Sequence, residues 1–136
     1  MAQVHVAIGL IVEAGQILVS KRAYGDRFEQ CWELPGGKLA PGEDPAHCIH
    51  REIQEELGVT VTIVAALPEI SHDYASFQVC LHPFILRLKT GTPRPLASRE
   101  LKWVTIQQIA TLRFPEANAS LIRDLPEILS KLHLLR

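Results

Sequence analysis

Apolar and polar positions divide the chain into short β-like runs separated by turns and helix-like segments. Residues 4–22, VHVAIGLIVEAGQILVSKR, form two apolar runs joined at Ala14-Gly15, which predicts a β-hairpin. Because Pro83 cannot donate a hydrogen bond to a neighbouring strand, it predicts that its own strand is an edge strand or carries a bulge. The other predicted strands cover residues 31–34, 59–67, 77–88 and 101–104.

One segment carries the start and stop signals of a complete helix. Asp44 suits the N-cap, Pro45 suits the first helical position, and Gly58 suits the position after the end. Thr105 predicts the cap of a second, short helix through Leu112.

The pattern from residue 116 to the C-terminus is also helical, and Pro126 is expected to kink or split that helix. Strands therefore intermix with helices of different lengths. This order predicts an α/β fold, a mixed β-sheet with helices on both faces, in one domain spanning residues 1–136.

Charge and cysteine usage narrow the class of partner. The net charge is −1, so no strongly basic field exists for a nucleic acid polymer or a membrane surface, and we expect a small-molecule partner. The chain contains no run of about 18 apolar residues, so we expect no membrane-spanning helix. The N-terminal apolar run lacks a basic region and is interrupted by Glu13, which favours a strand over a signal peptide. Three irregularly spaced cysteines indicate free thiols and a cytoplasmic location.

Residues 51–58, REIQEELG, place three glutamates at the C-terminal end of the predicted helix, where anions are disfavoured. At about 100° per residue, all three side chains point into one sector. One interpretation is a solvated acidic face, and the other is a site for a hard cation, which would reverse the repulsion. A zinc site on the same helix lacks a second suitably spaced pair of ligands, although the helix carries His47, Cys48 and His50.

The residues before the helix favour the cation. Gly36-Gly37 allows a ligand or metal to approach the main chain. From Gly37 to Val59 the chain reads G-x5-E-x7-R-E-I-x-E-E-x-G-V, which resembles the Nudix box at every specified position. The resemblance implies a Nudix-type α/β/α sandwich with a mixed sheet. It also implies metal-dependent hydrolysis of a nucleoside diphosphate linked to another group.

The same resemblance assigns roles to individual residues. Arg51 orients a glutamate by a charge-assisted hydrogen bond, and Glu43 supports from outside the ligand set. Glu100, the carboxylate between Asp73 and Glu116, is the candidate for an additional acid that binds metal or acts as base, with a surface acid as its alternative. The implied ligands of Mg²⁺, with Mn²⁺ as a substitute, are Gly37, Glu52, Glu55, Glu56 and Glu100.

The resemblance extends past the box, because three runs look like the MutT-like branch: SKRA (20–23), WELPGGK (32–38) and FPEAN (114–118). MutT-like enzymes convert 8-oxo-dGTP into 8-oxo-dGMP and pyrophosphate, which sanitises the nucleotide pool for DNA replication and repair. Asn118 then hydrogen-bonds the base, or alternatively caps the last helix. The implied substrate-binding residues are Arg22 and Lys38 for phosphates, Leu34 and Asn118 for the base, and Phe77 and His82 as lining.

Other activities remain open at this point. Relatives with a similar box and WEFPGGK run prefer CTP or methylated pyrimidine nucleotides, and others cleave dinucleotides or sugar nucleotides. A non-catalytic, regulatory Nudix module is a third alternative, but such modules usually lose box acids that this chain keeps. We expect a monomer or a weak homodimer.

Overall fold

The computed structural model describes residues 2–26 and 28–135. Within this part of the chain, the strands join into one mixed sheet whose main order is β3-β2-β1-β7-β5, and β4, β6 and β8 pair with β1, β7 and β2. β1 is central: it runs parallel to β7 and antiparallel to β2 and β4. The elements are β1 (Ala2–Glu13), β2 (Gln16–Lys21), β3 (Trp32–Glu33), β4 (Gly36–Lys38), α1 (Pro45–Leu57), β5 (Thr60–Ala66), β6 (Ile70–Asp73), β7 (Phe77–Thr90), β8 (Glu100–Val104), α2 (Ile106–Ile109), the 3₁₀-helix η1 (Glu116–Asn118) and α3 (Ala119–Lys131).

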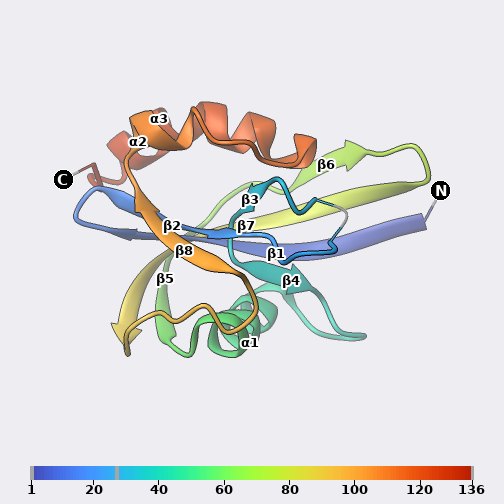
Figure 1. Cartoon of the computed structure of the whole chain (residues 1–136), viewed down its shortest axis with the longest axis horizontal. Coiled ribbons are helices and arrows are strands. Elements are labelled where there is room, and N and C mark those ends of the chain that lie inside the picture. The colour runs from blue at the N-terminus through green and yellow to red at the C-terminus, as the bar shows by residue number, and fades with distance from the viewer. Residues whose placement is uncertain (1, 27, 136) are drawn as a thin grey trace.

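Helices cover both faces of the sheet, with α1 on one side and α2 and α3 on the other (Figure 1). Two apolar clusters result, since alternate residues of a strand face opposite sides. On one side Ile49 and Ile53 of α1 pack against Ile11 and Leu86. On the other side Leu121, Leu125 and Leu129 of α3 join the cluster that contains Leu10. The structure thus confirms the predicted α/β/α layering.

α1 begins and ends where its signals predict. The Asp44 carboxylate accepts a hydrogen bond from the backbone N–H of His47 at 2.8 Å, and Pro45 is the first helical residue. Gly58 ends the helix at φ 71°, in the left-handed region that glycine tolerates. Its N–H donates to the Gln54 carbonyl at 3.0 Å. These caps fix the rotation of α1, and with it the direction of the box acids.

The expectation for Pro83 is wrong in part, because β7 is an interior strand. On one side β7 pairs with β1 over Ala2–Ile11, where Ile8 lies opposite Pro83. On the other side its neighbour changes from β6 to β5 around Pro83, whose carbonyl accepts from the Leu67 N–H at 2.9 Å. The missing donor therefore falls at a break in the antiparallel ladder.

Further differences concern short elements and the last helix. The predicted strands include neither β4, the three-residue strand that the glycine pair opens, nor β6. α3 continues through Pro126, which is exposed, and no split occurs. The three cysteines are free, as predicted. None of the helices in the described part of the chain has the length and apolar character needed to cross a bilayer.

Candidate active site

Two glutamates of α1, Glu52 and Glu56, extend to the backbone of β4. Glu56 accepts a hydrogen bond from the Gly36 N–H at 3.1 Å. Burial, together with the nearby carboxylates of Glu33 and Glu52, raises the pKa of Glu56 to about 8 against the lowering effect of that bond. A buried acid held among other acids is a common feature of functional sites.

Gly37 is in direct contact with the Glu52 side chain. A Cβ placed on Gly37 would lie 2.6 and 2.7 Å from the two Glu52 carboxylate oxygens. Any larger residue would displace this carboxylate, so the glycine permits main chain and acid to approach each other. The Gly37 carbonyl also accepts from the Cys48 thiol at 3.5 Å.

Arg51 organises the acids from within α1. Its Nε and Nη2 atoms each donate to the Glu43 carboxylate at 2.8 Å, and its Nη1 donates to Glu52 at 2.9 Å and Glu55 at 3.3 Å. Hydrogen bonds from Arg51 hold the pKa of Glu43 well below its usual range, and the same carboxylates raise the pKa of Arg51. One guanidinium thus positions three carboxylates, two of which, Glu52 and Glu55, are implied metal ligands.

This donor set suits a hard divalent cation. Three carboxylates and a nearby main-chain carbonyl offer oxygen ligands, which Mg²⁺ and Mn²⁺ prefer. The zinc alternative on α1 does not form. Cys48 is fully buried, burial raises the pKa of its thiol to about 11, and it donates to main-chain carbonyls. His47 points to Glu43 instead, with Nδ1 2.7 Å from the carboxylate.

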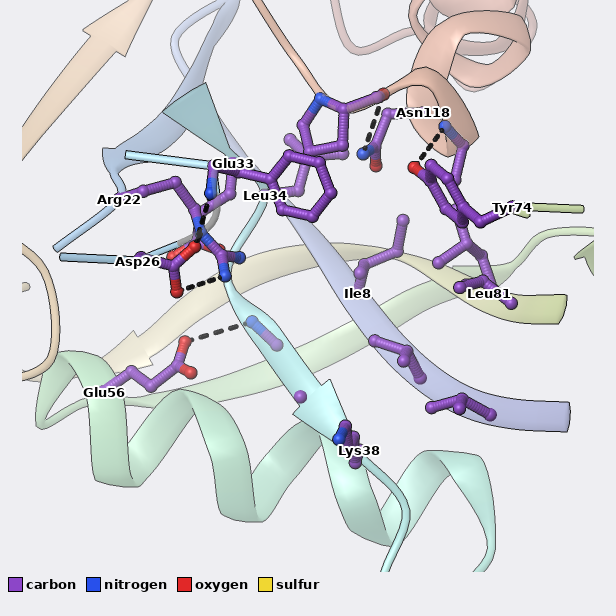
Figure 2. A pocket seen from close by; sticks show the side chains of 18 of the residues that line it. Ile8, Arg22, Asp26, Glu33, Leu34, Lys38, Glu56, Tyr74, Leu81 and Asn118 are labelled. Carbon is purple, nitrogen blue, oxygen red and sulfur yellow. Dashed lines mark hydrogen bonds and ion pairs between the residues drawn. The ribbon is translucent and has the colours of Figure 1, made fainter. Parts of the chain in front are cut away.

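A cavity of about 460 Å³ extends from the box to the start of α3 (Figure 2). Glu56 and Lys38 lie at one end, and Asn118 lies at the other. Gly37 also lines the cavity. Apolar side chains of the sheet form its floor between these ends. They are Val4, Val6, Ile8, Val79 and Leu81. A ligand with an anionic part at the Lys38 end and a flat, partly apolar part toward Asn118 would fit this cavity.

Asn118 is 8% exposed and turns its amide into the cavity. It occupies the residue before α3, but its side chain makes no capping bond there. Its Nδ2 instead donates to the Pro115 carbonyl at 3.4 Å. Near it, Tyr74 stacks on Phe77 at 5.1 Å and its hydroxyl accepts from the Ala117 N–H at 3.1 Å. An amide thus stands beside aromatic rings.

Arg22 reaches the cavity but is engaged by two carboxylates. It pairs with Asp26 at 2.7 Å and with Glu33. These acids raise the pKa of Arg22 even though burial opposes its charge. Burial raises the pKa of Glu33, and Arg22 opposes this shift. An incoming phosphate would have to compete with both acids for the guanidinium.

The predicted substrate residues separate into those inside the cavity and those outside it. Arg22, Leu34, Lys38, Phe77 and Asn118 line it. His82 does not, contrary to the prediction. It alternates with Leu81 on β7 and faces the α1 side of the sheet, where its Nε2 lies 3.0 Å from His5 Nδ1.

Glu100 also lies outside the cavity, exposed at the first position of β8. The loop before it is closer, because Ala97 and Ser98 share a small pocket with Glu33 and Glu56. Among the polar side chains that line the cavity, the sequence did not single out three: Asp26, Glu33 and Tyr74. Glu33 belongs to the WELPGGK run, and its charge within that run could have indicated a role in the site. Tyr74 follows a strand that was not predicted, and no sequence feature indicated its place in the cavity.

The family model described as the NUDIX domain matches residues 1–125. This chain belongs to the NUDIX family. The NUDIX protein is 32% identical over 123 residues to 8-oxo-dGTP diphosphatase of Haemophilus influenzae, covering 90% of each chain. It is 33% identical over 126 residues to putative 8-oxo-dGTP diphosphatase 2 of Mycobacterium tuberculosis, covering 92% of this chain and 89% of that one.

Structural comparison supports the same NUDIX fold. The solution structure of the E. coli ORF135 protein superposes with a TM-score of 0.82 at 22% identity, covering 96% of this chain and 94% of the other. As in the NUDIX family generally, the box acids are suited to a divalent metal ion, and the chain is a NUDIX hydrolase.

Proposed function

We propose that this protein is a Mg²⁺-dependent nucleoside triphosphate pyrophosphohydrolase that converts 8-oxo-dGTP into 8-oxo-dGMP and pyrophosphate. One observation carries the proposal: a single cavity joins the box residues Gly37 and Glu56 to a buried amide, Asn118, beside aromatic rings. Relatives named 8-oxo-dGTP diphosphatase that match nine-tenths of the chain support the choice of base. The biological role would be removal of an oxidised precursor before DNA synthesis.

The chain's own residues would divide the work along the cavity. Asn118 reads the base through its amide, and Leu34 and Phe77 give apolar contact. Arg22 and Lys38 hold phosphates, and Arg51 keeps Glu52 and Glu55 in position. Glu52, Glu55, Glu56 and the Gly37 carbonyl would hold a divalent cation, which would supply charge neutralisation and Lewis acidity for the attack of water on phosphorus. Water adds to phosphorus as the P–O–P bond breaks, which yields the monophosphate and pyrophosphate.

A substrate panel tests the proposal. The protein with Mg²⁺ is incubated with 8-oxo-dGTP, dGTP, CTP, 5-methyl-dCTP, ADP-ribose and a diadenosine polyphosphate, and the products are quantified. We expect a much higher kcat/KM for 8-oxo-dGTP than for dGTP, with pyrophosphate as co-product. Preference for a pyrimidine nucleotide or for ADP-ribose would replace the proposed substrate but keep the hydrolase. No turnover of any compound, with metal binding demonstrated, would contradict an enzymatic role.

Replacing Asn118 with Ala should reduce kcat/KM for 8-oxo-dGTP by about 10–100-fold, since an unpaired polar base edge costs about 1–3 kcal/mol. The loss should be smaller for CTP, so discrimination between the two nucleotides should narrow. Gln107→Ala removes an exposed amide on α2 and is the matched control. An equal loss for every nucleotide would assign Asn118 to structure instead of base recognition.

Replacing Glu100 with Gln tests the predicted additional acid. If Glu100 binds metal or acts as the base, kcat should fall far more than KM, by about 10²-fold or more. Steady-state kinetics at saturating Mg²⁺ separates the two constants. Because the side chain is exposed, the fold should not change. An unchanged kcat would remove Glu100 from the mechanism.

A further inference from the structure

A second group of metal-ligating side chains lies across the sheet from the nucleotide cavity. His5 of β1, Cys80 of β7 and Glu69, which directly precedes β6, each offer one ligand atom, and these atoms all lie within 4.8 Å of one another. Along β1 and β7 these residues alternate with the cavity floor. The floor residues beside them are Val4, Val6, Val79 and Leu81.

His82 completes the surroundings of His5. His82 Nε2 lies 3.0 Å from His5 Nδ1, and the two rings stack with centroids 5.3 Å apart. His82 Nδ1 lies 3.9 Å from a Glu69 carboxylate oxygen. A histidine that binds metal usually has its other ring nitrogen hydrogen-bonded, which fixes its tautomer and orientation. His82 is placed to do this for His5.

The Cys80 sulfur sits among hydrogen-bond donors. The residue is fully buried, and its sulfur accepts from Gln3 Nε2 at 3.1 Å, with the Ser71 hydroxyl 3.6 Å away. The Cys48 thiol differs, since it donates to two carbonyls.

We propose that His5, Glu69 and Cys80 form a site for Zn²⁺ or a similar divalent transition metal, with His82 as a positioning residue. Nitrogen, sulfur and oxygen ligands at about 2.0–2.3 Å place ligand atoms roughly 3.3–3.6 Å apart in a tetrahedron. Glu69 is exposed and can close the remaining separation. Water fills the fourth position, and the thiol proton of Cys80 leaves to solvent as the metal binds.

The site differs from the box in chemistry and in effect. The box offers oxygen ligands, whereas this group includes an imidazole and a thiolate that select softer metals. Its ligands come from β1, β7 and the start of β6, so a bound ion would link three segments. Two of these strands carry the cavity floor, and the ion would stiffen that wall.

Co²⁺ is the spectroscopic probe for this site. With the box saturated by Mg²⁺, the wild-type protein should bind one Co²⁺ at this site and show a thiolate-to-cobalt charge-transfer band in the near ultraviolet. The band should disappear in Cys80→Ser and persist in Cys31→Ser, which removes another buried thiol. No band in wild-type protein, or a band that survives in Cys80→Ser, would overturn the proposal.

Zn²⁺-dependent stability tests the ligand Glu69 and the positioning residue His82 without requiring the buried cysteine to be altered. Wild-type protein should unfold at a higher temperature with Zn²⁺ than with a chelator. Glu69→Gln should lose at least about tenfold in Zn²⁺ affinity, and His82→Gln about 10–100-fold, with unchanged melting in chelator for the exposed Glu69→Gln. His50→Gln, an exposed histidine on α1, is the control and should behave as wild type. Equal Zn²⁺ shifts in all four proteins would contradict the assignment.

Discussion

Replacing Glu55 with Gln is expected to reduce kcat by about 10³-fold or more while the fold remains intact. The amide has the size of the carboxylate but lacks its charge, and a charge interaction worth several kcal/mol in the transition state corresponds to this factor. The Glu55 side chain is 58% exposed and contacts Arg51 at 3.3 Å, so little packing is lost. Steady-state kinetics and circular dichroism on the same preparation measure both effects.

The same substitution should change the stability of the protein in chelator only a little, because the lost ion pair with Arg51 and the relieved repulsion are of similar size. Glu55 lies near other carboxylates at the C-terminal end of α1, where like charges and the helix dipole each cost a few tenths of a kcal/mol. Glu127→Gln is the matched control, because it removes an exposed glutamate from α3. The Glu127→Gln variant should keep its full activity. Full activity in Glu55→Gln with unchanged Mg²⁺ dependence would disprove the proposed role of the box acids.

Sequence features predicted the part of the site that lies on one element. Asp44 and Gly58 mark the two ends of α1, so the direction of its glutamates followed from helical periodicity. Spacing also identified Gly37, whose contact with Glu52 requires a residue without a side chain. Both signals are local in sequence. In a regular helix, the spacing of residues along the sequence determines the directions of their side chains.

The remaining parts depend on contacts between distant segments. His82 was assigned to the wrong side because the face of a strand residue depends on register, and a shift by one residue exchanges the faces. The Arg22 pair with Glu33 joins β2 to β3, and Tyr74 meets Ala117 across 43 positions. No periodicity predicts such pairs. The grouping of His5, Glu69 and Cys80 was hidden for the same reason.

Replacing Gly36 with Ala is expected to destabilise the protein by at least about 4 kcal/mol and to abolish activity, since severe backbone clashes belong to the largest class of mutational effects. A Cβ at this position would lie 2.9 Å from both the Ala7 carbonyl carbon and the Ile8 Cα, and would overlap the Ala7 carbonyl oxygen. These are backbone atoms of the central strand, so no side-chain rotation relieves the contact. β4 would have to separate from β1, which removes their register at Ile8 and Gly36.

Activity should fall even in any molecules that remain folded, because the Gly36 N–H would no longer reach Glu56. Gly42→Ala is the matched control: Gly42 also has a positive φ, 75°, but a Cβ there meets nothing within 4 Å. That variant should lose only about 1 kcal/mol, the cost of a left-handed alanine. Urea unfolding gives the free energy of each variant, and product formation gives the activity. Similar losses in the two variants would show that backbone conformation, not the packing of β4 on β1, sets the requirement for glycine.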